Sequence, residues 1–367
     1  MQHLKLLTQP DDGINQLVKG IRKAKKSVEV VIFRFDCSEI EQALVDAARR
    51  GVLVHALIAS TNRGGEERLR KLETRLLAKG VSVTRTAGDL VRYHGKMILI
   101  DRKELYLLAF NFTHLDIEHS RSFGLIMRNR ELVNEAVRLF EADTKRQPYA
   151  AGQQKFVVSP VNARQSLAAF LKGAKKELLI YDPKISDRAM LRVLQERKNA
   201  GVEIRVIGKV GSNRLPARAL SSRLHTRSIV RDRRLAFIGS QSLRALELDS
   251  RREIGVIFGN RFVISALVQT FEQDWGTAKR TDHDVLPRKT VRKVAKAVGK
   301  NLPIGSLVKQ VVKAVHSKRN LELGPREVEE TVKTAVKEAV KDSVKEAAKD
   351  AIMSLVAPEI DGEGDRN

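Results

Sequence analysis

Cysteine, aromatic residues and long apolar runs are scarce in this chain of 367 residues. Cys37 is its only cysteine, which excludes an intrachain disulfide and a zinc site built on several cysteines, and which favours a reducing compartment. The longest apolar runs, such as residues 28–33, are much shorter than the ~20 residues that a membrane-spanning helix needs. Residues 1–13 lack the apolar core of a secretion signal. We therefore expect a cytoplasmic protein.

Positive charge, by contrast, is abundant. The chain has 68 Lys and Arg against 44 Asp and Glu, a formal net charge of +24, while its 42% of hydrophobic residues is typical of globular proteins. Such an excess predicts an anionic partner, and both nucleic acids and acidic membrane surfaces qualify. Aromatic residues make up only 5% of the chain, so stacking platforms for single-stranded nucleic acids are few.

The chain contains an internal repeat of strand-like and helix-like segments. An apolar run at 28–33 is followed by a helix-like stretch and by a second strand-like segment at 51–54. The same order recurs 150 residues later, at 178–181 and 201–204. Alternating strand and helix periods predict an α/β fold, with sheets that are mixed and largely parallel.

A second correspondence, displaced by 131 residues, covers the rest of each copy. It joins His94 to His225, Lys96 to Arg227, Asp101 to Asp232, Asn111 to Ser242 and Gly124 to Gly255. The offset changes because the first copy has an extra charged helix around 66–79. We therefore expect two related modules, 1–150 and 151–282, packed about a pseudo-two-fold axis that brings equivalent loops together.

The composition changes again in residues 283–367. Residues 288–319 contain ten Lys or Arg and no acid, with valines at helical spacing, and apolar residues recur every four positions between 332 and 352. The pattern predicts a tail of basic and amphipathic helices. Such a helix suits an anionic membrane surface, although packing on the core or on another copy of the chain explains the apolar stripe equally well. The pattern predicts no particular oligomeric state.

One short motif stands in both copies: a histidine, a cation two positions on and an aspartate seven positions on. Its members are His94, Lys96 and Asp101 in the first copy and His225, Arg227 and Asp232 in the second. Positions i and i+2 of a strand point to the same side, so each imidazole and its cation should face one site. The aspartates fall at the far end of each strand, where we expect a structural role.

Two histidines and two cations at one site are suited to phosphodiester chemistry. One neutral imidazole attacks phosphorus while the other, protonated, donates its proton to the leaving oxygen. Lys96 and Arg227 would hold the non-bridging oxygens and offset the charge of the transition state. No acidic cluster has metal-ligand spacing, so the sequence predicts no metal and no cofactor.

These residues resemble the paired HKD motifs of the phospholipase D superfamily, with Asn111 seventeen residues after the first histidine. The resemblance covers about residues 20–275. It implies two α/β modules that form one site, and a phosphohistidine intermediate with His94 as nucleophile and His225 as general acid. It also implies that three further residues bind the substrate phosphate or orient the histidines, namely Asn111, Ser242 and Glu253.

Each copy departs from the family pattern at a different position. Arg227 stands where the family has lysine, and its fork is bulkier than an ammonium group. The family usually places an acid 28 residues after the histidine to orient its ring. Glu253 fills this place in the second copy, whereas Ser122 stands there in the first. We therefore expect Glu253 beside His225, and this expectation leaves the reverse assignment of the two histidines open.

Three functions fit this pattern. The first is a phospholipase D-type phosphodiesterase or phosphatidyltransferase that acts on phospholipids at an anionic membrane surface, which the basic segment 288–319 favours. The second is a metal-independent nuclease, which the net charge favours and the scarcity of aromatic residues disfavours. The third is a non-catalytic scaffold that keeps only affinity for phosphate or nucleic acid. We expect the first, in a cytoplasmic protein that associates peripherally with a membrane.

Overall fold

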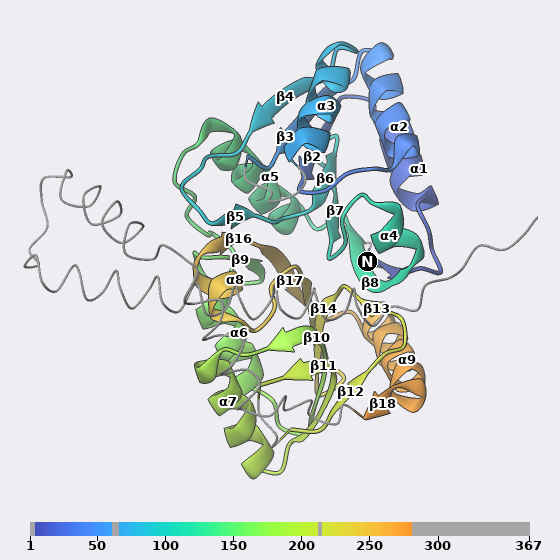
Figure 1. The fold of residues 1–367 in the computed structure, drawn as a ribbon. Coiled ribbons are helices and arrows are strands. Elements are labelled where there is room, and N and C mark those ends of the chain that lie inside the picture. Colours follow the sequence, from blue (N-terminus) through green and yellow to red (C-terminus); the bar gives the residue numbers. More distant parts are fainter. Residues whose placement is uncertain (1–3, 61–65, 212–214, 281–367) are drawn as a thin grey trace, which may run out of the picture. The chain divides into compact units, whose positions relative to one another are not determined.

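Two α/β halves form the described part of the chain in this computed structural model, which covers residues 4–60, 66–211 and 215–280 (Figure 1). The first half contains strands β1 (Leu4–Gln9), β2 (Ser27–Ile32), β3 (Leu53–Ile58), β4 (Ser82–Arg85), β5 (Arg92–Tyr93), β6 (Met97–Ile100), β7 (Glu104–Leu108) and β8 (Ser120–Met127), and helices α1 (Asn15–Lys23), α2 (Ser38–Arg49), α3 (Glu66–Leu77), α4 (His114–Glu118) and α5 (Arg130–Lys145). The second half contains strands β9 (Phe156–Val158), β10 (Glu177–Ile185), β11 (Glu203–Val210), β12 (Ala217–Ala219), β13 (Arg223–Leu224), β14 (Arg227–Arg231), β15 (Leu235–Gly239), β16 (Arg251–Arg252), β17 (Ile254–Phe258) and β18 (Lys279–Arg280), and helices α6 (Ala163–Lys172), α7 (Arg188–Asn199), α8 (Ala245–Asp249) and α9 (Arg261–Thr277).

The two halves repeat one strand order. The first sheet runs β1-β8-β7-β6-β2-β3-β4 and the second runs β9-β17-β15-β14-β10-β11-β12, so equivalent strands occupy equivalent places. Two short pairs cross between the halves, because β13 adds to β8 and β16 pairs with β5. The α/β fold of two related modules, predicted from the repeat, is confirmed. The tail expected in residues 283–367 lies outside the described residues.

The sheets are mixed, but the expectation that they are largely parallel is wrong. In each large sheet, strand pairs within one half are parallel at one end only, along β2-β3-β4 in the first sheet and β10-β11-β12 in the second. The other described pairs within each half are antiparallel. The strands after each histidine motif run antiparallel because a three-residue connection, 101–103 or 232–234, reverses the chain. Asp101 and Arg102 both have a φ of 53°, and Asp232 and Arg233 have 54° and 52°. These left-handed values match the tight hairpin turn that suits the twist of paired strands.

The two aspartates of the motifs also hold the turns to the rest of the sheet. The Asp101 carboxylate accepts hydrogen bonds from the backbone amides of Lys25, Lys26 and Ser27, at 3.0, 2.6 and 3.0 Å. Asp232 does the same for residues 175–177 in the second half. Both therefore act on the strand end opposite to the histidines.

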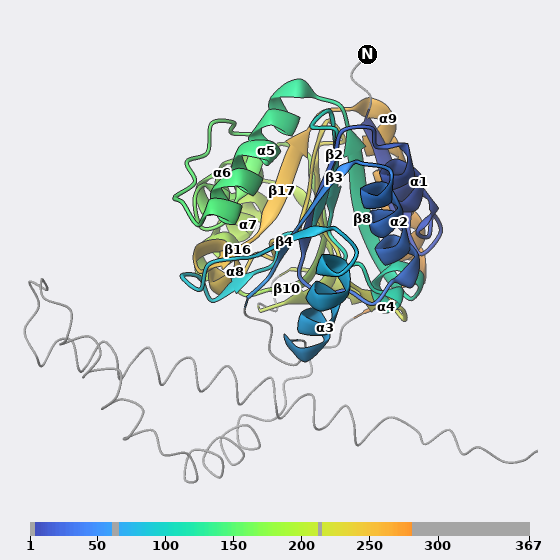
Figure 2. The same cartoon turned by 90° about the horizontal axis from the view of Figure 1, so that it is seen from above.

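The core consists of apolar layers on both faces of the sheets. In β2, Val28, Val30 and Ile32 point to the cluster that includes α1 and α2, while Val31 points to a central cluster. This alternation follows from the two-residue period of a strand. The central cluster draws side chains from both sheets and from α5 and α9. Figure 2 shows α1 and α2 on one side of the first sheet and α5 on the other. The two halves thus meet through a shared apolar layer.

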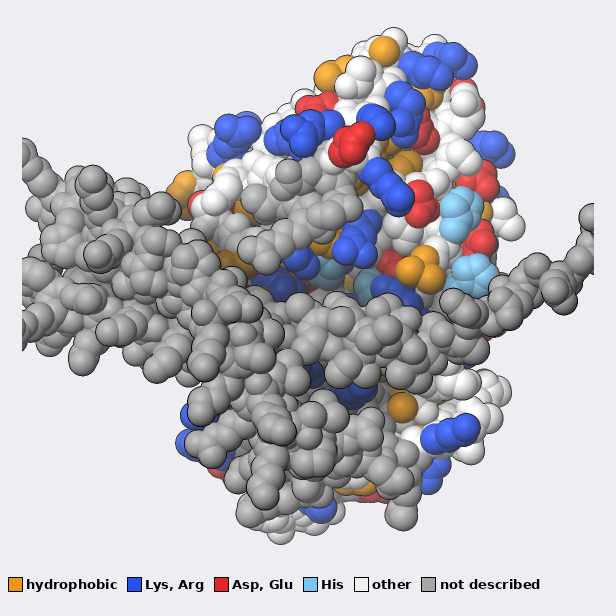
Figure 3. Space-filling model, viewed as in Figure 1, with side chains coloured by type: hydrophobic (Ala, Val, Ile, Leu, Met, Phe, Trp, Pro, Cys, Tyr) orange, Lys and Arg blue, Asp and Glu red, His pale blue; other side chains and the backbone are white. Residues whose placement is uncertain are grey.

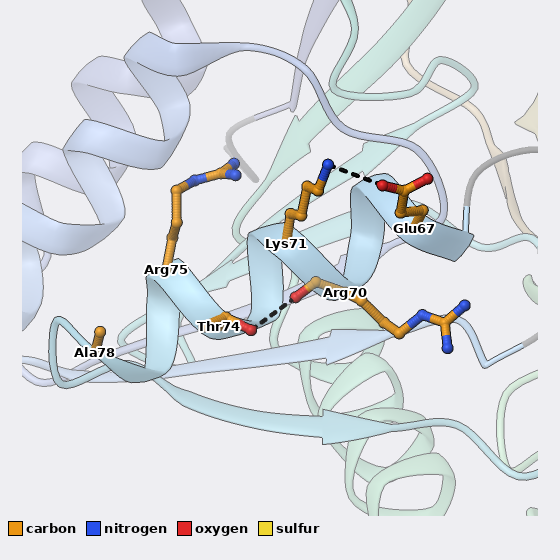
Figure 4. A pocket seen from close by; sticks show the side chains of 6 residues that line it. All are labelled: Glu67, Arg70, Lys71, Thr74, Arg75 and Ala78. Carbon is orange, nitrogen blue, oxygen red and sulfur yellow. Dashed lines mark hydrogen bonds and ion pairs between the residues drawn. The ribbon is translucent and has the colours of Figure 1, made fainter.

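The extra helix expected near 66–79 is α3, which connects β3 to β4. Its surface carries a shallow hollow beside charged side chains (Figure 4), lined by Glu67, Arg70, Lys71, Thr74, Arg75 and Ala78. No residue of the two histidine motifs lines this hollow. Within the described ranges, no helix combines the length and apolarity needed to cross a bilayer.

We predict that Asp101→Ala and Asp232→Ala each lower the free energy of unfolding by about 1–3 kcal/mol, because each removes three hydrogen bonds to a carboxylate. Partial burial opposes ionisation of Asp101, but the backbone amides outweigh it and hold the pKa of Asp101 below its usual value. Its contribution is therefore present at neutral pH and is lost as the pH falls through that pKa. Chemical denaturation at pH 7 and pH 3 measures both effects. An unchanged free energy of unfolding at pH 7 would contradict the assignment.

Candidate active site

His94 lies in the short connection between β5 and β6, with its ring almost fully buried. Its Nδ1 is 2.8 Å from Oε2 of Glu253, and its Nε2 is 2.7 Å from Nζ of Lys96. Burial lowers the pKa of Lys96 and raises that of Glu253, while the attraction between the two charges opposes both shifts. The Glu253 carboxylate accepts at Nδ1, so Nδ1 carries the ring proton and Nε2 presents its lone pair to Lys96. The lone pair of Nε2 therefore points to the cation of its own motif, as a nucleophile held by an acid requires.

His225 occupies the equivalent connection, between β13 and β14, and is somewhat more exposed. Its Nδ1 is 3.2 Å from Oδ2 of Asp116. Asp116, from the first half, thus takes the place of an acid that orients this ring. The two groups are too poorly aligned for a hydrogen bond, and Nδ1 of His225 has no other partner among the described residues. Asp116 also binds Arg223, by a close contact to the guanidinium group.

The expectation that Glu253 lies beside His225 is wrong, because the acids are exchanged between the halves. Glu253, from the second half, binds His94 of the first, and Asp116, from the first half, lies against His225 of the second. Ser122, at the position equivalent to Glu253, donates from its hydroxyl to the backbone carbonyl of His225 at 2.8 Å. The structure therefore removes the reason for reversing the roles of the two histidines.

Backbone contacts follow the same crosswise pattern. The amide of His94 donates to the carbonyl of Arg252 at 2.7 Å, and the amide of His225 donates to the carbonyl of Arg121 at 3.0 Å. The side chains of these two arginines also cross between halves. Arg121 pairs with Asp274 on α9 at 2.9 Å, and Arg252 pairs with Asp143 on α5 at 3.0 Å.

The remaining motif residues form a buried polar network. Arg227 donates from Nε to the hydroxyl of Ser242 at 3.0 Å, and the amide of Ser242 donates to Glu247 at 2.7 Å. In the first half, Asn111 donates to Asp116 from its backbone amide and from Nδ2, at 2.8 and 2.6 Å. The side-chain oxygen of Asn111 and Nη1 of Arg227 are buried without partners in the described residues, so both remain available to a substrate.

The sequence analysis missed Asp116 and Glu247. The two residues are 131 positions apart, which is the same offset that joins the histidines. Asp116 accepts a hydrogen bond from the backbone amide of Asn111, and Glu247 accepts one from that of Ser242. A search for acids that recur at this offset would have found them. Arg92 and Arg223 are a further pair at the same offset, each two residues before a histidine.

Burial keeps both imidazoles neutral at pH 7. Desolvation, together with the charges of Lys96 and Arg227, holds the pKa of His94 well below its usual value. Desolvation also holds the pKa of His225 well below its usual value, with Asp116 opposing the shift and the same two cations adding to it. The same two cations thus lower the pKa of both rings, as expected if the two motifs share one site. An entering phosphate would offset this positive charge and favour protonation of His225.

Among the described residues, one group of metal-binding type contains no residue of the histidine motifs. Asp36, Cys37 and His114 place one ligand atom each within 4.8 Å of one another. Burial, with nearby acids, raises the pKa of the Cys37 thiol to about 12, so the thiolate that a metal needs is disfavoured. His114 is bound through Nδ1 to Glu118 at 2.8 Å, which leaves only its other ring nitrogen, Nε2, for a metal. The three residues therefore fit a metal poorly.

Comparison with known proteins gives one family match. The profile described as "Cardiolipin synthase, PLD-like domain" matches residues 17–144. A polyphosphate kinase from Pseudomonas syringae pv. tomato is 27% identical over 248 residues, which cover 61% of this chain and 33% of the kinase. A mitochondrial cardiolipin hydrolase from Mus musculus is 26% identical over 135 residues, which cover 37% of this chain and 59% of the hydrolase. The chain thus spans a third to three-fifths of the length of these curated relatives.

Among solved structures, a phosphatidylserine synthase from Haemophilus influenzae Rd KW20 has a similar fold over most of both chains. The TM-score is 0.60 at 12% sequence identity, with 93% of this chain and 94% of the synthase covered. The likeness supports the two-module fold.

We predict that Asp116→Asn lowers the pKa of His225 further, because it removes the charge that opposes the downward shift. The pKa of His94 should change less, since its Nδ1 partner is Glu253. NMR titration of the labelled histidine rings measures both values in one sample. An unchanged or raised pKa of His225 would show that Asp116 does not stabilise its protonated form.

Proposed function

Because the chain belongs to the phospholipase D superfamily, we propose that it hydrolyses or exchanges the headgroup phosphodiester of phospholipids through a phosphohistidine formed on His94. The observation that carries the proposal is the His94 arrangement, in which Glu253 holds Nδ1 at 2.8 Å and leaves Nε2 facing Lys96. A neutral imidazole held in this tautomer is ready to attack phosphorus.

In the first step, Nε2 of His94 attacks phosphorus as Lys96 moves its contact from the ring to a non-bridging oxygen. The P–O bond to the leaving alcohol breaks, and protonated His225 donates its proton to that oxygen. Glu253 accepts the Nδ1 proton in a hydrogen bond and stabilises the positive charge that develops on the phosphorylated ring. Lys96 and Arg227 offset the negative charge of the transition state.

In the second step, neutral His225 removes a proton from water or from an acceptor alcohol. The oxygen attacks phosphorus, the P–N bond breaks, and His94 returns to its starting state while His225 is again protonated. Hydrolysis and transfer thus differ only in the second nucleophile.

Phospholipids are the substrate class that the relatives favour. The matched profile and the mouse relative both carry cardiolipin in their names. The family also contains nucleases, and the net charge of +24 suits a nucleic acid as well as an acidic membrane. Phosphoryl transfer between phosphate chains is a second candidate, because the polyphosphate kinase match spans 248 residues and therefore extends beyond one module.

We predict that His94→Ala and His225→Ala each lower turnover of phospholipid at least 10²-fold, because one removes the nucleophile and the other the general acid. His55→Gln is the matched control, since His55 lies on β3 and binds Thr84 instead of a motif residue. Circular dichroism is used to check that each variant folds. Activity above about one percent of wild type in either variant would overturn the two-histidine mechanism.

We further predict that turnover survives EDTA and that a rapid acid-free quench with labelled phospholipid traps phosphate on His94. Peptide mapping of the labelled protein identifies the residue. In the His225→Ala variant, label that forms slowly should remain on His94. In the His94→Ala variant, no label should be found. Activity that returns only with added Mg²⁺ or Zn²⁺ would contradict the mechanism.

A further inference from the structure

A buried aromatic ring next to His94 gathers three cationic side chains. The ring of Phe33, the residue after β2, lies edge-on to the His94 ring with centroids 4.5 Å apart. The Arg34, Arg92 and Lys96 cations lie 5.8, 5.3 and 5.3 Å from its centre. An aromatic face attracts a cation but accepts few of the five N–H donors of a guanidinium group. Arg34 and Arg92 therefore keep most of their donors for another partner.

A fourth cation faces this group from the second half. In the pairing of β5 with β16, Arg92 and Arg251 are direct partners. Like charges opposite each other on paired strands destabilise a sheet. The equivalent pair, where β13 adds to β8, is Arg223 with Ser120, and there the serine hydroxyl accepts a hydrogen bond from Arg223 at 2.8 Å. The repulsive pair is therefore specific to the His94 side of the site.

Carboxylates neutralise this group only in part, through the pairing of Arg251 with Glu247. For Arg34 and Arg92, no ion pair is found in the part of the chain that the structure describes, whereas Arg223 binds Asp116. Arg251 approaches Glu247 at 3.5 Å, but its Nε is buried without a partner. Burial, Arg251 and Arg34 together lower the pKa of Arg92, with Glu253 and Glu247 opposing the shift. On the face viewed in Figure 3, Lys and Arg side chains gather where the two halves meet.

We propose that Arg34, Arg92 and Arg251 form a second anion subsite beside His94, which binds an additional phosphate group of the substrate. The inference rests on the proposed function and narrows it to phospholipids that carry two phosphates, of which one reacts at His94. Lys96 and Arg227 already belong to the reacting phosphate. A substrate with only one phosphate would leave the three guanidinium groups repelling one another, while a second phosphate would accept their hydrogen bonds.

The subsite is tested with Arg92→Gln, Arg251→Gln and Arg34→Gln in the full chain. Arg22→Gln is the matched control, because Arg22 is exposed on α1 and precedes the opposite end of β2 from Phe33. The probes are cardiolipin, with two phosphates, and phosphatidylglycerol, with one, each in mixed micelles at fixed lipid mole fraction. Polyphosphate serves as a third probe. Thermal unfolding checks the fold, and Arg34→Gln, at an exposed position, tests the subsite even if a variant at the half-buried Arg92 or Arg251 unfolds.

We expect the Arg92 and Arg251 variants to raise KM for cardiolipin at least 10-fold more than KM for phosphatidylglycerol, with little effect on kcat. Arg34→Gln should act in the same direction, and Arg22→Gln should match the wild type. Equal effects on both lipids, or none, would overturn the subsite and leave the lipid function standing. Turnover of polyphosphate but of neither lipid, with KM for polyphosphate raised by the same variants, would support the subsite and overturn the lipid function.

Discussion

Two backbone hydrogen bonds between the halves support the whole site. The amide of His94 donates to the carbonyl of Arg252, and the amide of His225 donates to that of Arg121. Each arginine is fixed in turn by a buried ion pair with a helix of the opposite half. Separating such a pair would leave a charge without its partner, which costs free energy. The two ion pairs therefore help to keep β8 paired with β13 and β16 paired with β5. Each half therefore supplies a backbone acceptor that helps to hold the histidine of the other.

Much of this architecture could be predicted from two offsets in the sequence. Displacements of 150 and 131 residues identified the repeated modules, and the recurrence of a histidine, a cation and an aspartate identified the motifs. Offsets report which residues are equivalent, but they do not report which copy a side chain faces. For this reason Glu253 was expected beside His225, whereas the structure places it on His94. The antiparallel strands were missed for a local reason, since Asp101 and Asp232 adopt left-handed turns that strand periodicity does not reveal.

The two halves share a fold but differ in electrostatics. His94 has a well-aligned acid at Nδ1 and a lysine at Nε2, while His225 has only a misaligned acid and an arginine that is bound to Ser242. An exact duplication of one module would place identical groups on both sides of the pseudo-two-fold axis. The differences suit the two-step reaction that we propose, because a nucleophile needs a fixed tautomer and an acid–base group needs to change its protonation state.

Because residues of the second half orient His94, the first half cannot form this arrangement before the second half has been made. Arg252 and Glu253 come from β16 and the residue that follows it, close to the end of the described core. During synthesis the first histidine leaves the ribosome more than a hundred residues before the carbonyl and the carboxylate that orient it. Domains form as their residues emerge, so a partly made chain presents an unoriented imidazole. The proposed nucleophile is thus oriented only when nearly the whole of the described core has been made.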